Sequence, residues 1–362
     1  MNFLRNLLAS IMGTLIALGI IFMVFVLFAA LAGNQQQTIT VKNGSVLQLH
    51  LTQPIKDYGG QFHFKDIEYK FEKYDGLNHI LNAINYAKTD ANIKGISIKN
   101  SMLMAGTAQI KAIRDALADF KESGKFVYAY GDYYLQKDYY LASVADSIFL
   151  NPVGEMDFRG LSSEVLYFKD LQEKSGVKME VIRHGKYKSA VEPYLENTMS
   201  DANRQQITEL LQSVWQSIVG DIAKSRGISE EKLNLLADSL GARSANLALQ
   251  NKFIDGLLYY DEYEVLLKRV RGGDATTDIE YVEVEAYAEM VAQKSKKYGK
   301  DKVAVLFAQG EIFYGKGNQD YIGQGLLAEA LKEAREDDKV KSIVLRVDSP
   351  GGSALASDII WR

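Results

Sequence analysis

"GLNHILNAINYAKTDANIKGISIK" (residues 76–99) places a helix pattern directly before a strand pattern. One face of the expected helix carries five apolar side chains: Leu77, Ile80, Leu81, Ile84 and Ala87. The stretch then ends on "IKGISIK", a short apolar run typical of a buried strand. Because helices and strands in alternation build sheets whose faces are covered by helices, this stretch predicts an α/β fold.

The neighbouring segments continue the alternation. "SVLQLHL" (45–51) alternates as a half-buried strand does, and "KFVYAYG" (125–131) is a further strand. Between them, "AQIKAIRDALADFKES" (108–123) has helical spacing, and Gly124 is positioned to end that helix. We therefore expect a mainly parallel β-sheet flanked by helices.

A second stretch, "GLLAEALKEAREDDKVKSIVLRV" (325–347), repeats the helix and strand pattern 247 residues later. Five positions of the first stretch match five of the second: Ile80, Ile84, Ala87, Asp90 and Lys94 match Leu327, Leu331, Ala334, Asp337 and Lys341. A tandem duplication is the simplest interpretation, although two unrelated α/β units can also share such a pattern. The predicted organisation is a membrane segment (1–33), a tether (34–44), a first repeat with a helical extension (45–270), a linker (271–301) and the start of a second repeat (302–362).

Composition excludes several classes of function. The chain has 362 residues, more than the roughly 250 to 300 that one core serves, so at least two units are expected. A net charge of -4 predicts no nucleic-acid partner. The absence of cysteine excludes thiol nucleophiles, and the four histidines have no metal-ligand spacing. We predict no metal and no cofactor.

The N-terminus predicts a membrane anchor. "LLASIMGTLIALGIIFMVFVLFAALAG" (7–33) exceeds the roughly 20 apolar residues that cross a bilayer. A cleaved signal peptide is the alternative, because Ala30-Leu31-Ala32 fits a cleavage site, but its apolar run is usually only about 7 to 15 residues. Arg5 favours a cytoplasmic N-terminus, which would place the folded part outside the cytoplasm.

Two motifs carry candidate chemistry. In "VDSPGGS" (347–353), Gly351 and Gly352 lie between a strand and a helix, where exposed N–H groups suit an oxyanion; an ordinary turn is the alternative. In "VIRHGKYKSAVEPY" (181–194), the segment is expected to leave a strand and to hold Lys188 in a fixed loop. Burial there would lower the lysine pKa and allow it to act as a general base; a solvated surface charge is the alternative.

"YKSAVEP" (187–193) and "VLRVDSPGGS" (344–353), with the anchor and the duplication, resemble the signal peptide peptidase A family of S49 serine peptidases in its long, duplicated form. The resemblance implies tandem Clp-protease/crotonase-like repeats and a Ser-Lys dyad. It assigns Lys188 as the general base, and Gly351 and Gly352 to the oxyanion hole. The family's nucleophilic serine would lie beyond Arg362, so we expect the sequence to be incomplete and residues 1–362 to be inactive.

Two further expectations concern the nucleophile. Ser353 is a minor candidate, because it is better placed to cap the helix that follows it. In the first repeat, Gln136 and Lys137 take roughly the place of the nucleophile, so that repeat is expected to be catalytically degenerate.

The resemblance favours a bacterial inner-membrane endopeptidase that faces the periplasm and degrades cleaved signal peptides. Its implied partners are an apolar, extended peptide substrate, membrane lipid and further copies of the chain in a homo-oligomer. Two alternatives from other classes are a non-catalytic membrane scaffold of the same fold and a crotonase-like acyl-CoA enzyme.

Overall fold

The computed structural model describes residues 2–33, 39–59, 75–99, 101–272, 277–294, 299–318 and 320–362. The chain divides into two compact units, Met1–Thr40 and Val41–Arg362. Residues 34–38 of the predicted tether lie outside the described residues.

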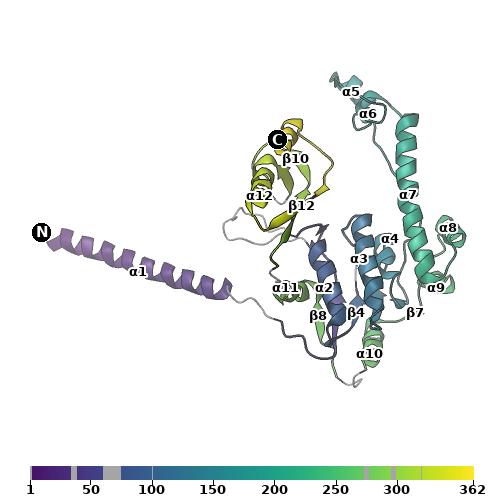
Figure 1. Ribbon diagram of the computed structural model, residues 1–362, viewed down its shortest axis with the longest axis horizontal. Helices are drawn as coiled ribbons and strands as arrows, with labels where there is room; N and C mark the ends of the chain where they lie inside the picture. The colour runs from purple at the N-terminus through teal and green to yellow at the C-terminus, as the bar shows by residue number, and fades with distance from the viewer. Residues whose placement is uncertain are drawn as a thin grey trace. The chain divides into compact units, whose positions relative to one another are not determined.

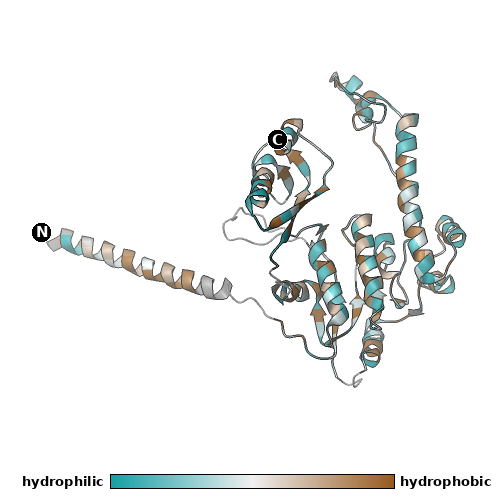
Figure 2. Cartoon of the chain, in the orientation of Figure 1, coloured by the Kyte–Doolittle hydropathy of each residue, from teal (hydrophilic) through white to brown (hydrophobic). Residues whose placement is uncertain are grey.

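The first unit contains one long helix, α1 (Asn2–Gly33). Within it, Arg5–Leu27 has 23 residues with a mean hydropathy of 2.6. At about 1.5 Å per residue this stretch matches the roughly 30 Å hydrocarbon core of a bilayer. Figure 2 shows the hydrophobic colouring along the helix. Among the described residues this is the one helix long and apolar enough to cross a membrane, a test that an N-terminal signal sequence also passes.

The second unit is built on a six-stranded sheet with the strand order β7-β6-β5-β4-β1-β8. Its strands are β1 (Ser45–Leu49), β4 (Ile93–Ile98), β5 (Phe126–Gly131), β6 (Ser147–Leu150), β7 (Gly256–Leu257) and β8 (Tyr281–Glu283). Every neighbouring pair is parallel. The predicted α/β fold with a parallel sheet is therefore confirmed.

Helices cover this sheet (Figure 1). They are α2 (Leu77–Thr89), α3 (Thr107–Lys121), α4 (Gln136–Ala142), α10 (Tyr260–Val270) and α11 (Val284–Lys294). Tyr130 of β5 packs with Tyr263 and Leu267 of α10. Because side chains alternate along a strand, the buried Val127 and Ala129 face the opposite side of the sheet, where α3 contacts β5.

The predicted linker over 271–301 is wrong for residues 281–294, which form β8 and α11. Strand β8 pairs with β1 at the edge of the sheet, and α11 packs on α2 through the buried Tyr287 and Val291. The first fold therefore extends to Lys294, because β8 adds a strand to its sheet and α11 packs on α2 beside α3.

The predicted helical extension is present. The sequence pattern predicts helical stretches over 201–226 and 229–250; helix α7 (Asp201–Arg226) matches the first, whereas the second is divided into α8 (Glu230–Asp238) and α9 (Ala245–Gln250). Two short helices precede α7, namely α5 (Lys169–Ser175) and α6 (Glu192–Leu195). Ser200, Ser229 and Ser244 each cap the helix that follows by accepting a backbone N–H, so the serine before α9 explains the division.

A second series of elements follows residue 301. It comprises β9 (Lys302–Gln309), β10 (Glu311–Phe313), β11 (Tyr321–Gly323), α12 (Gln324–Glu336), β12 (Val340–Asp348) and α13 (Ala354–Trp361). The first series has the same order: β1, β2 (Ile55–Lys56), β3 (Asp75–Gly76), α2, β4 and α3. Helix α12 begins and ends 247 residues after α2, and β12 begins 247 residues after β4.

The two series also share backbone hydrogen bonds. The Asp90 N–H donates to Tyr86 O, and the Asp337 N–H donates to Glu333 O, at equivalent helix ends. The Ile55 N–H donates to Met104 O at 2.9 Å. Likewise, the Ile312 N–H donates to Gly351 O at 2.8 Å. Equivalent positions of the two series therefore adopt the same local arrangement.

Residues 57–58 of the first series contact the second series. The Tyr58 ring stacks on Phe307 with centroids 5.1 Å apart. The Tyr58 N–H donates to Gln309 Oε1, and Gln309 Nε2 donates to Tyr58 O, both at 3.1 Å. Arg346 donates to the buried carboxylate of Asp57 at 2.5 Å. We call this set of contacts the 57–58 joint.

Candidate functional site

Lys188 lies in an irregular segment between α5 and α6. The strand expected before it is wrong, because residues 177–184 pair with no strand in the described part of the chain. Val177 and Met179, which alternate with polar residues in this stretch, are exposed. Their spacing is that of a strand, but no backbone of the described residues pairs with this segment as a strand requires.

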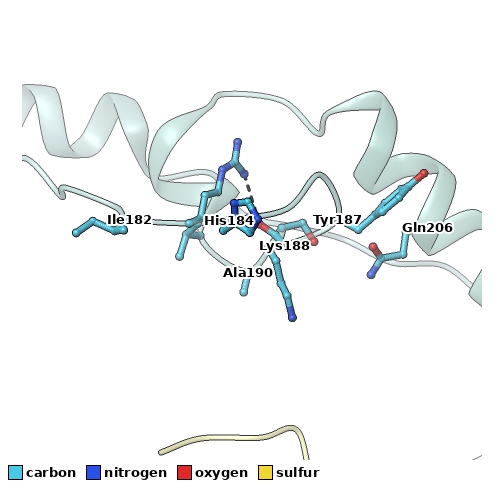
Figure 3. A pocket seen from close by; sticks show the side chains of 9 residues that line it. Ile182, His184, Tyr187, Lys188, Ala190 and Gln206 are labelled. Atoms are coloured by element: carbon cyan, nitrogen blue, oxygen red, sulfur yellow. Dashed lines mark hydrogen bonds between the residues drawn. The ribbon is translucent and has the colours of Figure 1, made fainter. Parts of the chain in front are cut away.

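An open cavity of about 500 Å³ surrounds Lys188. It is lined by Ile182, Arg183, His184, Tyr187, Lys188, Ser189, Ala190, Val191 and Gln206. Figure 3 shows the Lys188 side chain extending away from its loop. Burial of Lys188 beside Tyr187 and Tyr194 is what the sequence predicts, but both tyrosines are exposed, as is Lys188. Within the described chain the amino group makes no hydrogen bond or ion pair, whereas Arg183 donates to the Lys188 carbonyl oxygen at 3.4 Å.

Glu192 holds the segment that follows Lys188. Its side chain is only 2% exposed. It accepts the Ser200 N–H at 3.0 Å and the Asn203 side-chain amide at 2.5 Å. Glu192 therefore binds the N-terminus of α7 and not Lys188, which leaves the lysine free to act as a base. Desolvation alone would raise the pKa of Glu192, but the hydrogen bonds from Ser200 and Asn203 hold it below its usual value.

We expect Glu192→Gln to loosen this attachment in a pH-dependent way. A carboxylate with a lowered pKa stabilises the folded form above its unfolded pKa of about 4.3, and this contribution is lost as the pH falls. At pH 7 the variant should lose about 1 to 2 kcal/mol of local stability, the worth of hydrogen bonds to a charged group. Amide hydrogen exchange over residues 189–203 measures the loss as roughly tenfold or greater acceleration.

The exposed Glu196 provides a matched control, and Glu196→Gln should leave the exchange of residues 189–203 unchanged. The difference between Glu192→Gln and the parent protein should also shrink as the pH falls below about 4. Equal acceleration by both variants, or a difference that does not depend on pH, would contradict a specific role for Glu192.

The glycine loop, residues 347–353, has a backbone that favours glycine. Gly351 and Gly352 have φ values of +105° and +149°. A Cβ on Gly352 would lie 2.2 Å from the Ile312 carbonyl oxygen. The Gly351 N–H donates to Ser349 Oγ at 3.1 Å. Among the described residues, none accepts a hydrogen bond from the Gly352 N–H, so this amide is available to a ligand.

Ser353 caps α13, since its Oγ accepts the Ala356 N–H at 3.2 Å. This is the role that its position before a helix predicts. A hydroxyl oxygen that already accepts a helix N–H is poorly placed to attack a carbonyl carbon. The geometry therefore disfavours Ser353 as a nucleophile.

The residues in place of the nucleophile in the first series have structural partners. Gln136 Oε1 accepts the Arg159 and Gly160 N–H groups at 3.0 and 3.1 Å. Lys137 Nζ donates to Ala105 O at 2.8 Å. Both side chains hold loops together, so neither has a free group directed at a substrate.

Lys188 and the glycine loop do not share a cavity. Residues from 182–191 and Gln206 line the space around Lys188. In the described parts of residues 177–195 and 347–353, no hydrogen bond or ion pair joins one segment to the other. The structure thus provides a candidate base and a candidate oxyanion loop on separate elements.

Comparison with known proteins gives a family and several relatives. The model of peptidase family S49 matches residues 119–270, which include Lys188 and exclude the glycine loop. "Protease 4" of Salmonella typhi is 37% identical over 79% of this chain and 47% of its own length. "Protease 4" of Haemophilus influenzae is 30% identical over 99% of this chain and 60% of its own length. "Serine protease SPPA, chloroplastic" of Arabidopsis thaliana is 28% identical over 89% of this chain and 47% of its own length. The chain spans about half the length of these curated relatives.

Proposed function

The chain belongs to peptidase family S49, and we propose from this premise that it carries the general base and the oxyanion loop of a membrane-bound serine endopeptidase. The proposal is carried by the presence of two unused groups on separate elements. They are the amino group of Lys188 in its cavity and the N–H of Gly352. In the proposal these groups belong to one Ser-Lys catalytic site.

In the proposed mechanism, uncharged Lys188 accepts the proton of a serine hydroxyl as that oxygen bonds to the peptide carbonyl carbon. The carbonyl oxygen becomes an oxyanion, which accepts a hydrogen bond from the Gly352 N–H and, once that amide leaves Ser349 Oγ, a second one from the Gly351 N–H. The lysine then returns the proton to the leaving amine, and water hydrolyses the acyl-enzyme. Because Ser353 caps α13, we place the nucleophilic serine in the additional length of the curated relatives, and residues 1–362 alone are then inactive.

An uncharged lysine requires a drier setting than the open cavity provides, because solvent favours the charged amine. We propose that a further surface covers the cavity in the functional assembly. Apolar side chains of its lining support this, since Ile182 and Tyr187 are both exposed. A homo-oligomer supplies such a surface from a second copy of the chain.

The proposed substrates are cleaved signal peptides, which are apolar and extended. Helix α1 then anchors the protein in the bacterial inner membrane, next to the lipid in which such peptides are left. Arg5 lies on the cytoplasmic side in this proposal, and residues 41–362 face the periplasm.

We further propose that the two series of elements are tandem Clp-protease/crotonase-like repeats that divided the catalytic work. The common offset of α2 and α12 and the equivalent hydrogen bonds support a duplication. The first repeat contributes the base and the second contributes the oxyanion loop and, with it, the nucleophile.

The test is peptide hydrolysis by the full-length natural protein in detergent. We expect cleavage of an apolar signal-peptide sequence, and loss of cleavage when an organophosphonate labels one serine, which mass spectrometry locates. Absence of both hydrolysis and labelling would reject the peptidase and favour the scaffold. A protease-fusion assay that places residues 45–362 in the cytoplasm would instead favour the acyl-CoA enzyme.

A further inference from the structure

A carboxylate is enclosed at the carboxyl end of the first sheet. Asp138 in α4 is 1% exposed. Its Oδ2 accepts the Met102 N–H at 3.1 Å, and its Oδ1 accepts the Leu103 N–H at 2.9 Å. Two consecutive backbone amides therefore hold the two oxygens of one buried carboxylate, as they would hold a bound anion.

The charge of Asp138 is not balanced by a directly bonded cation. Lys137 is adjacent in sequence, but its ammonium donates to Ala105 O at 2.8 Å. In the described chain no ion pair involves Asp138, and burial raises its pKa, which the backbone hydrogen bonds from Leu103, Met102 and Leu135 and the charge of Lys137 partly oppose. Met102 has a φ of +61°, a conformation that is uncommon for a residue with a side chain and that orients its N–H toward Asp138.

The equivalent loop of the second series is arranged differently. At the offset of 247 residues, Met102 and Leu103 correspond to Ser349 and Pro350. Proline has no N–H, so the second loop lacks this pair of amides. Its positive φ values occur later, at Gly351 and Gly352. Ligands commonly bind at loops that follow the carboxyl ends of parallel strands. At this place the first series holds a side chain of its own, whereas the second has an open glycine loop.

We propose that the 101–106 loop is a carboxylate-binding site and that Asp138 is its built-in ligand. The side chain occupies the place that a small carboxylate or a developing oxyanion would take. This closes the first series to a substrate carbonyl and leaves one open loop, at Gly351 and Gly352. The inference concerns binding and does not depend on whether the proposed peptidase is active.

Removal of the built-in ligand should create a site for an external one. Asp138→Gly is expected to lower the unfolding temperature and to make it respond to formate. With formate at about ten times its dissociation constant, the unfolding temperature should rise by about 2 to 3 °C in a saturable way. The measurement is thermal unfolding of the full chain in sodium formate against sodium chloride at equal ionic strength.

Three controls separate a site from a general salt effect. The parent protein should not respond, because Asp138 fills the site. Asp138→Asn should not respond, because its amide occupies the same space. Asp146→Gly should not respond either, although Asp146 also accepts a backbone N–H, that of Val127 at 2.8 Å, because Asp146 is partly exposed.

The proposal is overturned if formate stabilises Asp138→Gly no more than chloride does, or stabilises all four proteins equally. If Asp138→Gly is unfolded in chloride, the same titration is followed as recovery of the folded signal. Absence of recovery over the whole formate titration would equally overturn it.

Discussion

Lys188→Ala in the full-length natural protein is expected to lower kcat for peptide hydrolysis by about 10²- to 10⁴-fold, the usual contribution of a general base. The fold should be unaffected, because the Lys188 side chain is exposed and makes no hydrogen bond or ion pair in the described chain. Steady-state hydrolysis of an apolar peptide measures the effect, with thermal unfolding measured in parallel.

Lys186 supplies the matched control for this experiment. It is also exposed, and its ammonium lies 5.4 Å from the Tyr187 ring. Lys186→Ala removes the same charge from the same loop but keeps the proposed base. Because a distant exposed charge is largely screened by salt, kcat should change by less than about threefold. Undiminished turnover in Lys188→Ala, or equal losses in the two variants, would exclude Lys188 as the base.

Arg114→Met is expected to destabilise the second unit by about 3 to 5 kcal/mol, because it removes a buried charge that several elements share. Arg114 of α3 is 4% exposed. Its guanidinium donates to the Tyr140 carbonyl oxygen and to Ser143 Oγ near α4. It also donates to Asp221 O at 3.3 Å and to Ser225 Oγ at 3.0 Å in α7. Methionine fills similar space but has no donor, so all four acceptors lose their hydrogen bond from Arg114, although Tyr140 O and Asp221 O keep those from Ser143 Oγ and Ser225 Oγ.

Urea unfolding followed by the fluorescence of Trp215 measures this loss. Trp215 lies on α7 and packs on Phe158 with ring centroids 5.3 Å apart, so it reports whether α7 stays attached. Lys111→Met on the same helix is the control. Lys111 pairs with Asp221 at 3.3 Å at a partly exposed position, and its loss should cost less than about 1 kcal/mol. A similar midpoint for both variants would refute the role given to Arg114.

The sequence predicted elements whose apolar spacing is regular and whose partners are local. Helix α2 and strand β4 lie within one or two residues of the expected bounds, because one face of each is fully buried. Strand β8 was missed because it has three residues and gains its stability from β1, more than 230 positions earlier in the chain. Alternation without such a partner produced the wrong strand before Lys188.

In the candidate site, too, local motifs were predictable and features that depend on distant residues were not. Motifs identified Lys188, Gly351 and Gly352, and the positive φ values of the two glycines agree with the residue type found there. No sequence pattern indicated Asp138, because its hydrogen-bond donors are main-chain N–H groups of residues 35 and 36 positions away, which any residue except proline supplies. The exposure of Lys188 was also unpredictable, since it depends on what covers the loop and not on the loop's own residues.

The 57–58 joint has a consequence for self-association. It is a contact between unlike surfaces, and a chain that carried both surfaces on each series would join copy to copy without end. The two series avoid this by differing at the contact itself. His50 stands in the first series where Phe307 stands in the second, and Tyr314 and Gly315 stand where the first has Asp57 and Tyr58. The second series therefore lacks the carboxylate at the position of Asp57 and the ring at the position of Tyr58, so it cannot repeat the same contact with a further copy of the surface around Phe307.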